Sequence, residues 1–383
     1  MTVIYLPDFH GGHRSVELRS PRDRVDHDFT SRVAFAAPHV VADWRSSAAP
    51  DQPVAVDWDA TLGFRRHLFG HGLRVAEATN TAQRNNGLDW PAVQELIRRS
   101  ALQAHEFGER IVSGAGTDHR CDVATLTEVG HAYGEQVEFV ESTGSQVVVL
   151  ASRQLAAAAR GADDYLDTYE ELLERVSEPV ILQWPDEHLD PTFGGYWGST
   201  DLVLAAETFL ALVAGNAAKV DGVQVPRLGC ELEAGLRTRF PDGVRVYTGN
   251  EIDYPAIIKG DGAHHSDALL VTFAAAAPAA AAAMAALDHD DIETYDQEMD
   301  TLVELSRHLV EPPTACATAG IAFLAWLCGH QDGFTVVGGL QAARSAAHLV
   351  RAFELANEAR LFPDPDLAAD RLLSWLDVAG VQL

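Results

Sequence analysis

Two lysines stand out in this 383-residue sequence because its 28 basic residues are otherwise all arginine. Lys219 lies in a short apolar run, where burial lowers the pKa of an amine and makes it nucleophilic. A lysine amine can form a Schiff base with a carbonyl compound, which arginine does not do. We therefore predict Lys219 as the catalytic nucleophile; the alternative is a structural lysine paired with Asp221 or another carboxylate. Lys259 needs no chemical role, because a cation is favourable at its predicted helix end.

Proton transfer to or from an imine substrate requires a second group within hydrogen-bond reach. Histidine suits this task because it titrates near neutral pH. Three pairs of adjacent residues could supply it: Asp118 with His119, Glu187 with His188, and His264 with His265. The alternative interpretation is that each pair is a hydrogen-bonded part of the rim, without a role in catalysis.

Polar and aromatic residues at the predicted strand ends could hold a substrate. Hydroxyl and amide groups hydrogen-bond to substrate oxygens, and a tryptophan can stack on the apolar face of a sugar. The candidate substrate-binding residues are Thr79, Thr81, Gln183, Trp184, Thr248, Gly249 and His264. The alternative is that the two early threonines cap a turn and that the tryptophan belongs to the core.

Two other classes of function remain open. A metal-dependent sugar isomerase or epimerase would use carboxylate and imidazole ligands, for which the candidates are Glu77, Asp118, His119, Glu187, His188, His264 and His265. No H-E-x-x-H or other short ligand motif supports such a site, so we expect neither a metal nor a cofactor. The third class is a non-catalytic ligand-binding barrel in which the lysine amine is dispensable.

The elements that must position these residues alternate between short apolar runs and segments of helical period. The eight predicted strands are Val54–Trp58, Leu73–Ala78, Arg110–Ser113, Gln146–Ala151, Pro179–Gln183, Ala217–Val220, Val244–Tyr247 and Ala268–Phe273. Strands that alternate with helices pair in parallel, and eight such units predict a closed (β/α)8 barrel. An open doubly wound sheet is the competitor, but the sequence has no G-x-G-x-x-G or other phosphate-binding turn. The active site of a barrel lies at the C-terminal ends of its strands.

The chain divides into three predicted regions. Residues 1–50 are polar and irregular, with one candidate strand near 32–37, and we interpret them as an N-terminal extension. Residues 51–290 form the predicted barrel, and residues 291–383 form a helical C-terminal region. The predicted helices of that region are Asp291–His308, Thr314–His330, Leu340–Arg360 and Leu367–Val378.

Composition excludes several kinds of partner. A net charge of −28 disfavours binding to nucleic acid or to an anionic membrane surface. The four cysteines contain no C-x-x-C pair, which argues against a disulfide scaffold or a structural zinc site. The sequence has no apolar stretch long enough to span a bilayer and no signal segment at its start. We therefore expect a cytoplasmic enzyme with a small-molecule substrate.

The order of these features resembles an uncharacterised branch of the dihydrodipicolinate synthase and N-acetylneuraminate lyase superfamily. In that family, a lysine on strand six of a (β/α)8 barrel forms a Schiff base with a 2-oxo acid, and Lys219 in Ala-Ala-Lys-Val-Asp-Gly falls at that position. Glycine-containing segments also match, at residues 113–117, 246–251 and 262–263. The resemblance implies a carbon–carbon lyase, aldolase or dehydratase that acts on a 2-oxo acid or a sugar-derived carbonyl compound. It also implies dimers or tetramers.

Two departures from the family pattern bear on mechanism. A tyrosine at the end of strand five relays protons in that family, but Gln183 or Trp184 stands there in this sequence. Glu187 and His188 follow that position, so we predict them as the catalytic acid and base. The family's Thr-Thr-Gly turn after strand two is replaced by residues 78–81, Ala-Thr-Asn-Thr, which lack the glycine that lets a carboxylate approach the backbone.

Overall fold

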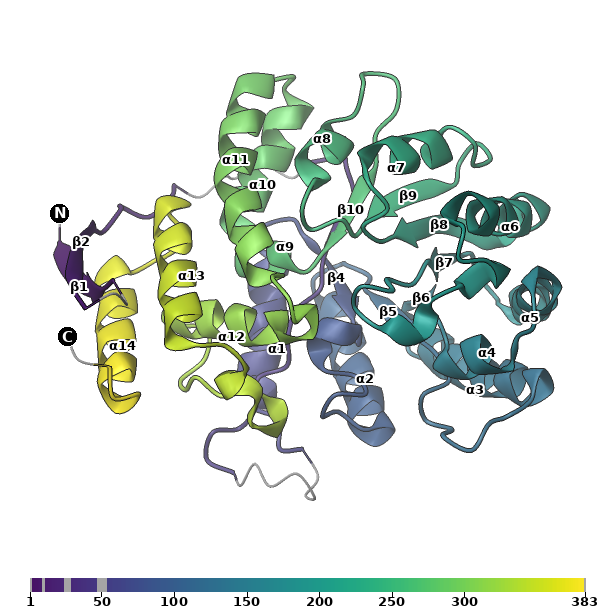
Figure 1. The fold of residues 1–383 in the computed structure, drawn as a ribbon, viewed down its shortest axis with the longest axis horizontal. Coiled ribbons are helices and arrows are strands. Elements are labelled where there is room, and N and C mark those ends of the chain that lie inside the picture. Colours follow the sequence, from purple (N-terminus) through teal and green to yellow (C-terminus); the bar gives the residue numbers. More distant parts are fainter. Residues whose placement is uncertain (1, 9–10, 24–28, 47–53, 382–383) are drawn as a thin grey trace.

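The computed structural model describes residues 2–8, 11–23, 29–46 and 54–381, and its centre is a closed barrel of eight parallel strands (Figure 1). The strands, in order around the barrel, are β3 (Ala34–Ala36), β4 (Arg74–Glu77), β5 (Val112–Ala115), β6 (Gln146–Val149), β7 (Val180–Gln183), β8 (Val220–Val225), β9 (Arg245–Thr248) and β10 (Asp267–Leu270). Every neighbouring pair is parallel, and β10 closes onto β3. The predicted (β/α)8 barrel is confirmed.

Helices follow each strand and cover the outside of the barrel. They are α1 (Trp58–Phe69), α2 (Trp90–Glu106), α3 (Leu126–Ser142), α5 (Ala162–Arg175), α6 (Leu202–Gly215), α7 (Cys230–Arg237), α8 (Tyr254–Lys259) and α10 (Ala277–Asp288), with short helices α4 (Arg153–Ala158) and α9 (Thr272–Ala275). Local sequence explains where they start. For α2, the Asp89 side chain accepts a hydrogen bond from the Ala92 amide, and Pro91 occupies the first turn.

The first barrel strand lies earlier than the sequence predicts. It is β3, inside the region interpreted as an N-terminal extension, whereas Val54–Trp58 is not a barrel strand. In that segment Val56 forms only an isolated antiparallel bridge with Ala42, and Trp58 begins α1. The barrel therefore begins before residue 51, although the predicted boundary at 50/51 itself lies outside the described residues. The candidate strand near 32–37 is therefore the first strand of the barrel, although only three residues form it and two of them are alanine.

The residues before the barrel form a small hairpin on the C-terminal helices. Strands β1 (Val3–Pro7) and β2 (His13–Glu17) pair antiparallel, and Figure 1 shows them beside the end of the chain. The Asn357 side chain joins this segment to the C-terminal region, because it donates to the Glu17 carbonyl and accepts from the Arg19 amide, both at 2.9 Å.

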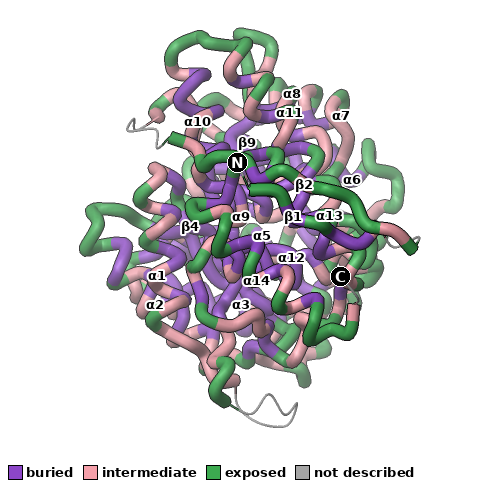
Figure 2. The backbone as a smooth tube through the Cα atoms, turned by 90° about the vertical axis from the view of Figure 1, so that its left-hand side faces the viewer, coloured by how far each residue is buried: buried purple, intermediate pink, exposed green. Residues whose placement is uncertain are grey.

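The predicted helical C-terminal region is confirmed. Its helices are α11 (Ile292–Leu309), α12 (Ala317–Leu327), α13 (Ala346–Glu358) and α14 (Pro365–Val378). Helix α12 is buried along almost its whole length (Figure 2). The Thr318 hydroxyl near its start donates to the Thr81 carbonyl at 3.4 Å, so α12 packs against the loop that follows β4. No helix among the described residues is long and apolar enough to cross a lipid bilayer.

Alternation along the strands separates the barrel interior from the layer beneath the helices. One buried cluster joins residues from strands all around the barrel, including Phe35, Val148, Ile181 and Tyr247, and these side chains face inward. Their neighbours along the strands pack in other clusters, against the surrounding helices. Since successive side chains of a strand point to opposite faces, this pattern identifies which polar residues face the interior.

Candidate functional site

Two glutamines face the barrel interior at the C-terminal ends of β7 and β8. Gln183 and Gln224 are register partners across this parallel pair. Ile181, two residues before Gln183, belongs to the interior cluster, so Gln183 faces inward as well. Val223 and Val225 pack outward against helices, which places the side chain of Gln224 on the inner face. The mouth of the barrel therefore carries two adjacent carboxamides.

The surroundings of Gln224 leave part of its hydrogen-bonding capacity unused. Its side chain is buried, and its Oε1 atom has no hydrogen-bond partner among the described residues. Gly249, directly after β9, makes room for this side chain, because a Cβ atom at that position would collide with the Gln224 amide nitrogen. The neighbouring Gln183 is partly satisfied, since its Oε1 accepts a hydrogen bond from the Ala151 amide at 3.3 Å.

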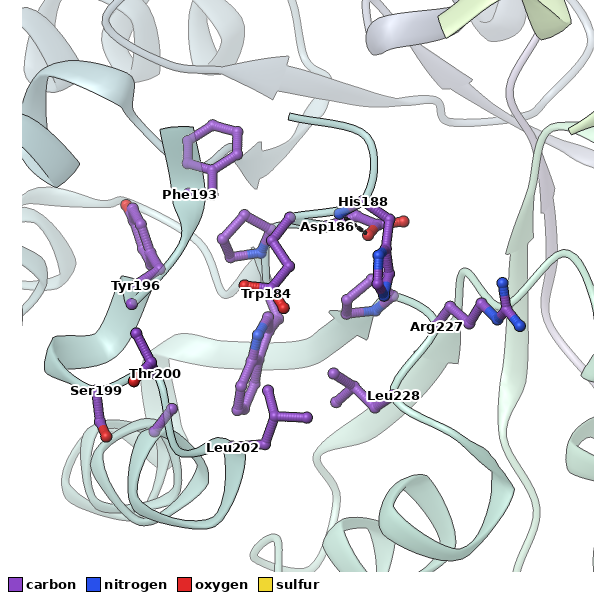
Figure 3. A pocket seen from close by; sticks show the side chains of 15 residues that line it. Trp184, Asp186, His188, Phe193, Tyr196, Ser199, Thr200, Leu202, Arg227 and Leu228 are labelled. Atoms are coloured by element: carbon purple, nitrogen blue, oxygen red, sulfur yellow. Dashed lines mark hydrogen bonds between the residues drawn. The ribbon is translucent and has the colours of Figure 1, made fainter. Parts of the chain in front are cut away.

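A pocket opens between the loops that follow β7 and β8 (Figure 3), and neither Gln183 nor Gln224 is among the residues that line it. Its empty volume, open solvent at its entrance included, is about 480 Å³. Residues that line it include Trp184, Asp186, Glu187, His188, Phe193, Tyr196, Ser199, Thr200, Leu202, Arg227 and Leu228. The pocket thus combines an apolar wall with carboxylate, imidazole, hydroxyl and guanidinium groups at the C-terminal face of the barrel.

The charged groups lie at the rim of this pocket. Glu187 and His188 are exposed, and the His188 amide donates to the Asp186 carboxylate at 2.9 Å, the bond drawn in Figure 3. Arg227 is exposed, and no ion-pair or hydrogen-bond partner for its guanidinium occurs among the described residues. Figure 3 shows the Arg227 side chain pointing away from Trp184. A carboxylate ligand could therefore pair with it.

The apolar wall is rigid. Trp184 packs edge-on against Phe209, with ring centroids 5.3 Å apart, and its backbone amide donates to the Gln224 carbonyl at 2.8 Å. The Tyr196 hydroxyl accepts from the Ser152 amide and pairs with the Tyr169 hydroxyl at 3.0 Å. Burial raises the pKa of Tyr196 well above its ordinary value, which favours the neutral hydroxyl.

Lys219 does not lie at this site, contrary to the prediction. The segment Ala217–Lys219 is a 3-10 helix that precedes β8, so Lys219 stands at the N-terminal end of the strand. Lys219 precedes Gln224 by five residues, which corresponds to roughly 16 Å along an extended strand. Its Nζ atom donates to the Val176 carbonyl at 2.8 Å, and Lys259 pairs with Asp296 at 2.6 Å. Neither lysine reaches the mouth, and the Schiff-base role predicted for Lys219 is wrong.

Two further predicted residues do not point into the mouth. The Thr248 hydroxyl donates to the buried Glu233 carboxylate of α7 at 3.1 Å, so it faces outward. Burial raises the pKa of Glu233 to about 7. His264 is exposed in the loop that leads into β10, and its amide donates to Asp261. This loop lies at the N-terminal end of the barrel, so His264 is not placed to contact a ligand at the other end. Thr248 ends β9 at the C-terminal end, but its hydroxyl faces outward.

The turn after β4 keeps its two hydroxyls in the folded protein. Thr79 is buried, and its Oγ1 atom has no hydrogen-bond partner among the described residues. Thr81 is buried in a 3-10 helix, Asn80–Ala82, whose backbone is held by α12. Both remain predictions as substrate-binding residues, because no distance places them against a ligand.

The proposed metal ligands do not converge. Glu77 faces outward and forms a fully buried, bidentate ion pair with Arg65, with N–O distances of 2.9 Å. Asp118 pairs with Arg84 at 2.5 Å, and His119 contacts the Glu135 carboxylate. Within the described part of the chain, no three of the candidates bring ligand atoms within 4.8 Å of one another. The geometry gives no support to the metal-dependent isomerase.

Sequence reasoning missed Gln224, Asp186 and Arg227. The sequence does indicate an inward Gln224, because Val220, Val223 and Val225 form one apolar face. The predicted strand ends at Val220, however, and so leaves Gln224 out. Asp186 lies three residues after the end of β7, and Arg227 lies two residues after the end of β8.

A family model described as "Protein of unknown function (DUF993)" matches residues 4–381. No curated protein matches this chain. Among solved structures, the fold is similar to that of YagE, a prophage protein of the dihydrodipicolinic acid synthase family from E. coli K12 in complex with pyruvate, with a TM-score of 0.66, 11% identity and coverage of 86% of this chain and 99% of that one.

Two dihydrodipicolinate synthases have similar folds. The enzyme from Aquifex aeolicus gives a TM-score of 0.64 at 11% identity, with 86% of this chain and 99% of that chain covered. The enzyme from Oceanobacillus iheyensis gives 0.63 at 13% identity, with 85% and 96% covered. The resemblance inferred from the sequence is thereby confirmed at the level of the fold. At such low identity the likeness does not extend to substrate or activity.

Proposed function

The chain belongs to the DUF993 family, whose function is unknown. We propose that the mouth of its barrel binds a small hydroxylated oxo acid or sugar acid without a covalent bond. One observation supports this most directly. The inward position near the end of β8 holds Gln224, whose buried Oε1 atom lacks a partner among the described residues. A carboxamide forms no imine, but it accepts a hydrogen bond from a ligand hydroxyl and donates to a ligand oxygen.

The energetics favour a ligand at this position. A buried acceptor without a donor costs about 1–3 kcal/mol, and a ligand hydroxyl that reaches Gln224 removes that cost. Gln183 places a second carboxamide beside the first. Arg227, three residues beyond Gln224, supplies a cation for a carboxylate. The combination suits a compound that carries hydroxyl, carbonyl and carboxylate groups together.

The likeness to YagE guides the choice of probes. That protein's structure was determined in complex with pyruvate, so pyruvate and longer 2-oxo acids are reasonable first ligands to test here. Sugar acids and keto sugars extend the panel to compounds with the hydroxyls that an unpaired amide oxygen would accept. A cytoplasmic location and assembly into dimers or tetramers stay predictions.

A second function at the same mouth is favoured by Glu187 and His188. Both line the pocket, and histidine titrates near neutral pH. In a carbon–carbon lyase without an imine, His188 would remove the proton of a ligand hydroxyl as the adjacent C–C bond breaks. The bonding electrons would move onto the carbonyl oxygen, and the Gln224 amide would stabilise the enolate by donating a hydrogen bond to that oxygen. Protonation of the enolate by the imidazolium would complete the reaction.

A binding experiment tests the primary proposal. Purified protein would be titrated with pyruvate, longer 2-oxo acids and sugar acids, with binding followed by calorimetry and by thermal shift. We expect saturable binding of at least one class and no mass adduct after borohydride reduction. In the variant Gln224→Leu, which keeps the volume but removes the amide, affinity should fall about 10-fold, because a hydrogen bond is worth roughly 1.5 kcal/mol.

The matched control is Gln146→Leu, the same change at the N-terminal end of β6. This variant should bind ligand as the wild type does. Equal affinity of Gln224→Leu and wild type would overturn the proposal, as would a borohydride-trapped adduct on the wild-type chain. Turnover by wild type that disappears in His188→Gln, with binding intact, would support the lyase in addition to the binding site.

A further inference from the structure

A cluster of two histidines and one glutamate joins helices α11 and α13, outside the barrel. His308 lies in the last turn of α11, Glu311 lies just beyond its end, and His348 lies in the first turn of α13. One ligand atom from each residue can be chosen so that all three lie within 4.8 Å of one another. The two imidazole rings are stacked, with centroids 3.9 Å apart and 22° between their planes, so one ring must turn before nitrogens of both can point at one ion.

Hydrogen bonding fixes the tautomer of His308 in a way that leaves two acceptors face to face. Its Nε2 atom lies 2.9 Å from the His348 carbonyl, and since a carbonyl only accepts, Nε2 carries the proton. In the neutral ring, Nδ1 then carries a lone pair and accepts hydrogen bonds. This atom lies 3.3 Å from a Glu311 carboxylate oxygen. A carboxylate also only accepts, so this contact is favourable when a proton or a metal ion lies between the two atoms.

His348 completes the arrangement. Its Nδ1 atom lies 3.5 Å from the other Glu311 oxygen, and its Nε2 atom is buried without a hydrogen-bond partner among the described residues. A neutral imidazole is the form that binds a metal.

We propose that His308, Glu311 and His348 bind a divalent transition-metal ion of the Zn²⁺ type. Two ligand atoms bonded to a tetrahedral zinc at 2.0–2.1 Å lie roughly 3.3 Å apart. The Nδ1 atoms of His308 and His348 lie 3.3 and 3.5 Å from the Glu311 carboxylate, each from a different oxygen, so a small turn of the carboxylate is needed to bring one oxygen to the ion. Two imidazoles and a carboxylate are a ligand set that zinc accepts, with a fourth position left for water. The hydrogen bond from His308 Nε2 to a backbone carbonyl is the outer contact that orients such ligands.

The surrounding helix end favours the cation as well. His308 and Glu311 lie at the C-terminus of α11, where the helix dipole is negative. The Arg344 guanidinium does not occupy the Glu311 carboxylate, because it donates to backbone carbonyls instead, at 3.2 Å to Leu309 and 2.6 Å to Glu311. Glu311 is exposed, which gives an ion a path from solvent. A bound ion would cross-link α11 to α13.

Metal titration of the full chain tests the site. Protein stripped with a chelator would be titrated with Zn²⁺ against a competing chelator, and with Co²⁺ to record the visible spectrum of a tetrahedral site. We expect one tightly bound equivalent, a tetrahedral cobalt spectrum and a higher melting temperature with metal. His308→Gln and His348→Gln should each weaken binding by more than about 100-fold, since loss of an outer-shell partner alone costs 10- to 100-fold.

Two variants keep the test decisive. His264→Gln removes an exposed histidine in a distant loop and should leave the metal affinity unchanged. Glu311→Gln preserves shape at an exposed position, so it should fold like the wild type and still weaken binding. The proposal would be overturned if stripped wild-type protein bound no tight equivalent, or if Glu311→Gln and His308→Gln bound metal as tightly as the wild type.

Discussion

Gln183 and Gln224 lie opposite each other on adjacent parallel strands, with both side chains facing the barrel interior. The family resemblance would place a proton-relay tyrosine at the end of strand five and an imine-forming lysine on strand six. This chain has a carboxamide at the inward position near each of those two strand ends. Neither carboxamide titrates or attacks a carbonyl group, so imine chemistry is absent at this pair.

A lysine introduced at this pair should restore imine formation. We predict that Gln224→Lys will give a borohydride-reducible adduct with pyruvate, whereas the wild-type chain will give none. The new amine would lie against Gly249, in the space that this glycine leaves open, and partial burial would lower its pKa toward neutrality. Intact-mass and peptide mass spectrometry check the adduct and its position.

The wild-type protein is its own control for nonspecific labelling, because it already carries Lys219 and Lys259. An adduct at Lys219 in the wild type would contradict the assignment of that residue to the far end of the barrel. Labelling of Gln224→Lys at no greater level than the wild type would show that position 224 does not face a ligand.

Gly249 should be needed for ligand binding rather than for folding. An added Cβ atom would displace the Gln224 amide and would also approach the Val225 carbonyl, 3.1 Å away. We therefore expect Gly249→Ala to lower the affinity for the acid ligand about 10-fold, which corresponds to one misplaced hydrogen bond of about 1.4 kcal/mol. Gly215→Ala is the matched control, since nothing lies within 4 Å of a Cβ there. Isothermal titration of both variants measures the difference.

Replacement of Lys219 should change stability and leave ligand binding intact. Its ammonium donates one hydrogen bond, to the Val176 carbonyl that ends α5, so Lys219→Met should lower the free energy of unfolding by about 1 kcal/mol. Urea denaturation measures the stability and calorimetry measures the affinity. If Lys219→Met abolished ligand binding while the protein stayed folded, a site at the opposite end of the barrel would be untenable.

Lys219 also shows why the site was harder to predict than the fold. The eight-unit alternation and the helical tail follow from apolar periodicity, which tolerates errors of several residues in each strand. A strand-end residue does not tolerate them, because a shift of five residues moves it from one end of the barrel to the other. The segment from Val220 to Val225 is apolar throughout its outward face. Because the predicted strand ends at Val220, Lys219 is predicted at the C-terminal end of the strand, whereas it lies just before the N-terminal end.

Tertiary context explains the other differences. Three residues, Ala34–Ala36, qualify as a strand only because their neighbours β10 and β4 pair with them. Thr248 follows the same alternation as any strand residue, and only the presence of Glu233 on α7 reveals that its hydroxyl faces outward. Such contacts join residues that are distant in sequence, so local sequence patterns do not predict them.

The Arg65–Glu77 pair should be important for stability because each buried charge is compensated by its partner. Both side chains are fully buried, and Ser100 donates a further hydrogen bond to the carboxylate at 2.7 Å. Removing one partner leaves an uncompensated buried charge, so Glu77→Leu should cost about 3–5 kcal/mol. The double variant Arg65→Met, Glu77→Leu should cost less than the sum of its single changes. Strictly additive losses in urea denaturation would contradict the coupling.

Glu233 should make stability fall as the pH rises toward neutrality. Burial raises its pKa from 4.5 to about 7, so between these values the folded state binds a proton that the unfolded state has released. The stabilisation is complete below pH 4.5 and is lost as the pH rises through 7, by about 3 kcal/mol. Glu233→Gln mimics the neutral acid at all pH values. The unfolding free energy of Glu233→Gln minus that of the wild type should therefore grow by about 3 kcal/mol from pH 4.5 to 8. Urea denaturation across this range measures it, and a difference independent of pH would show that Glu233 ionises normally in the folded protein.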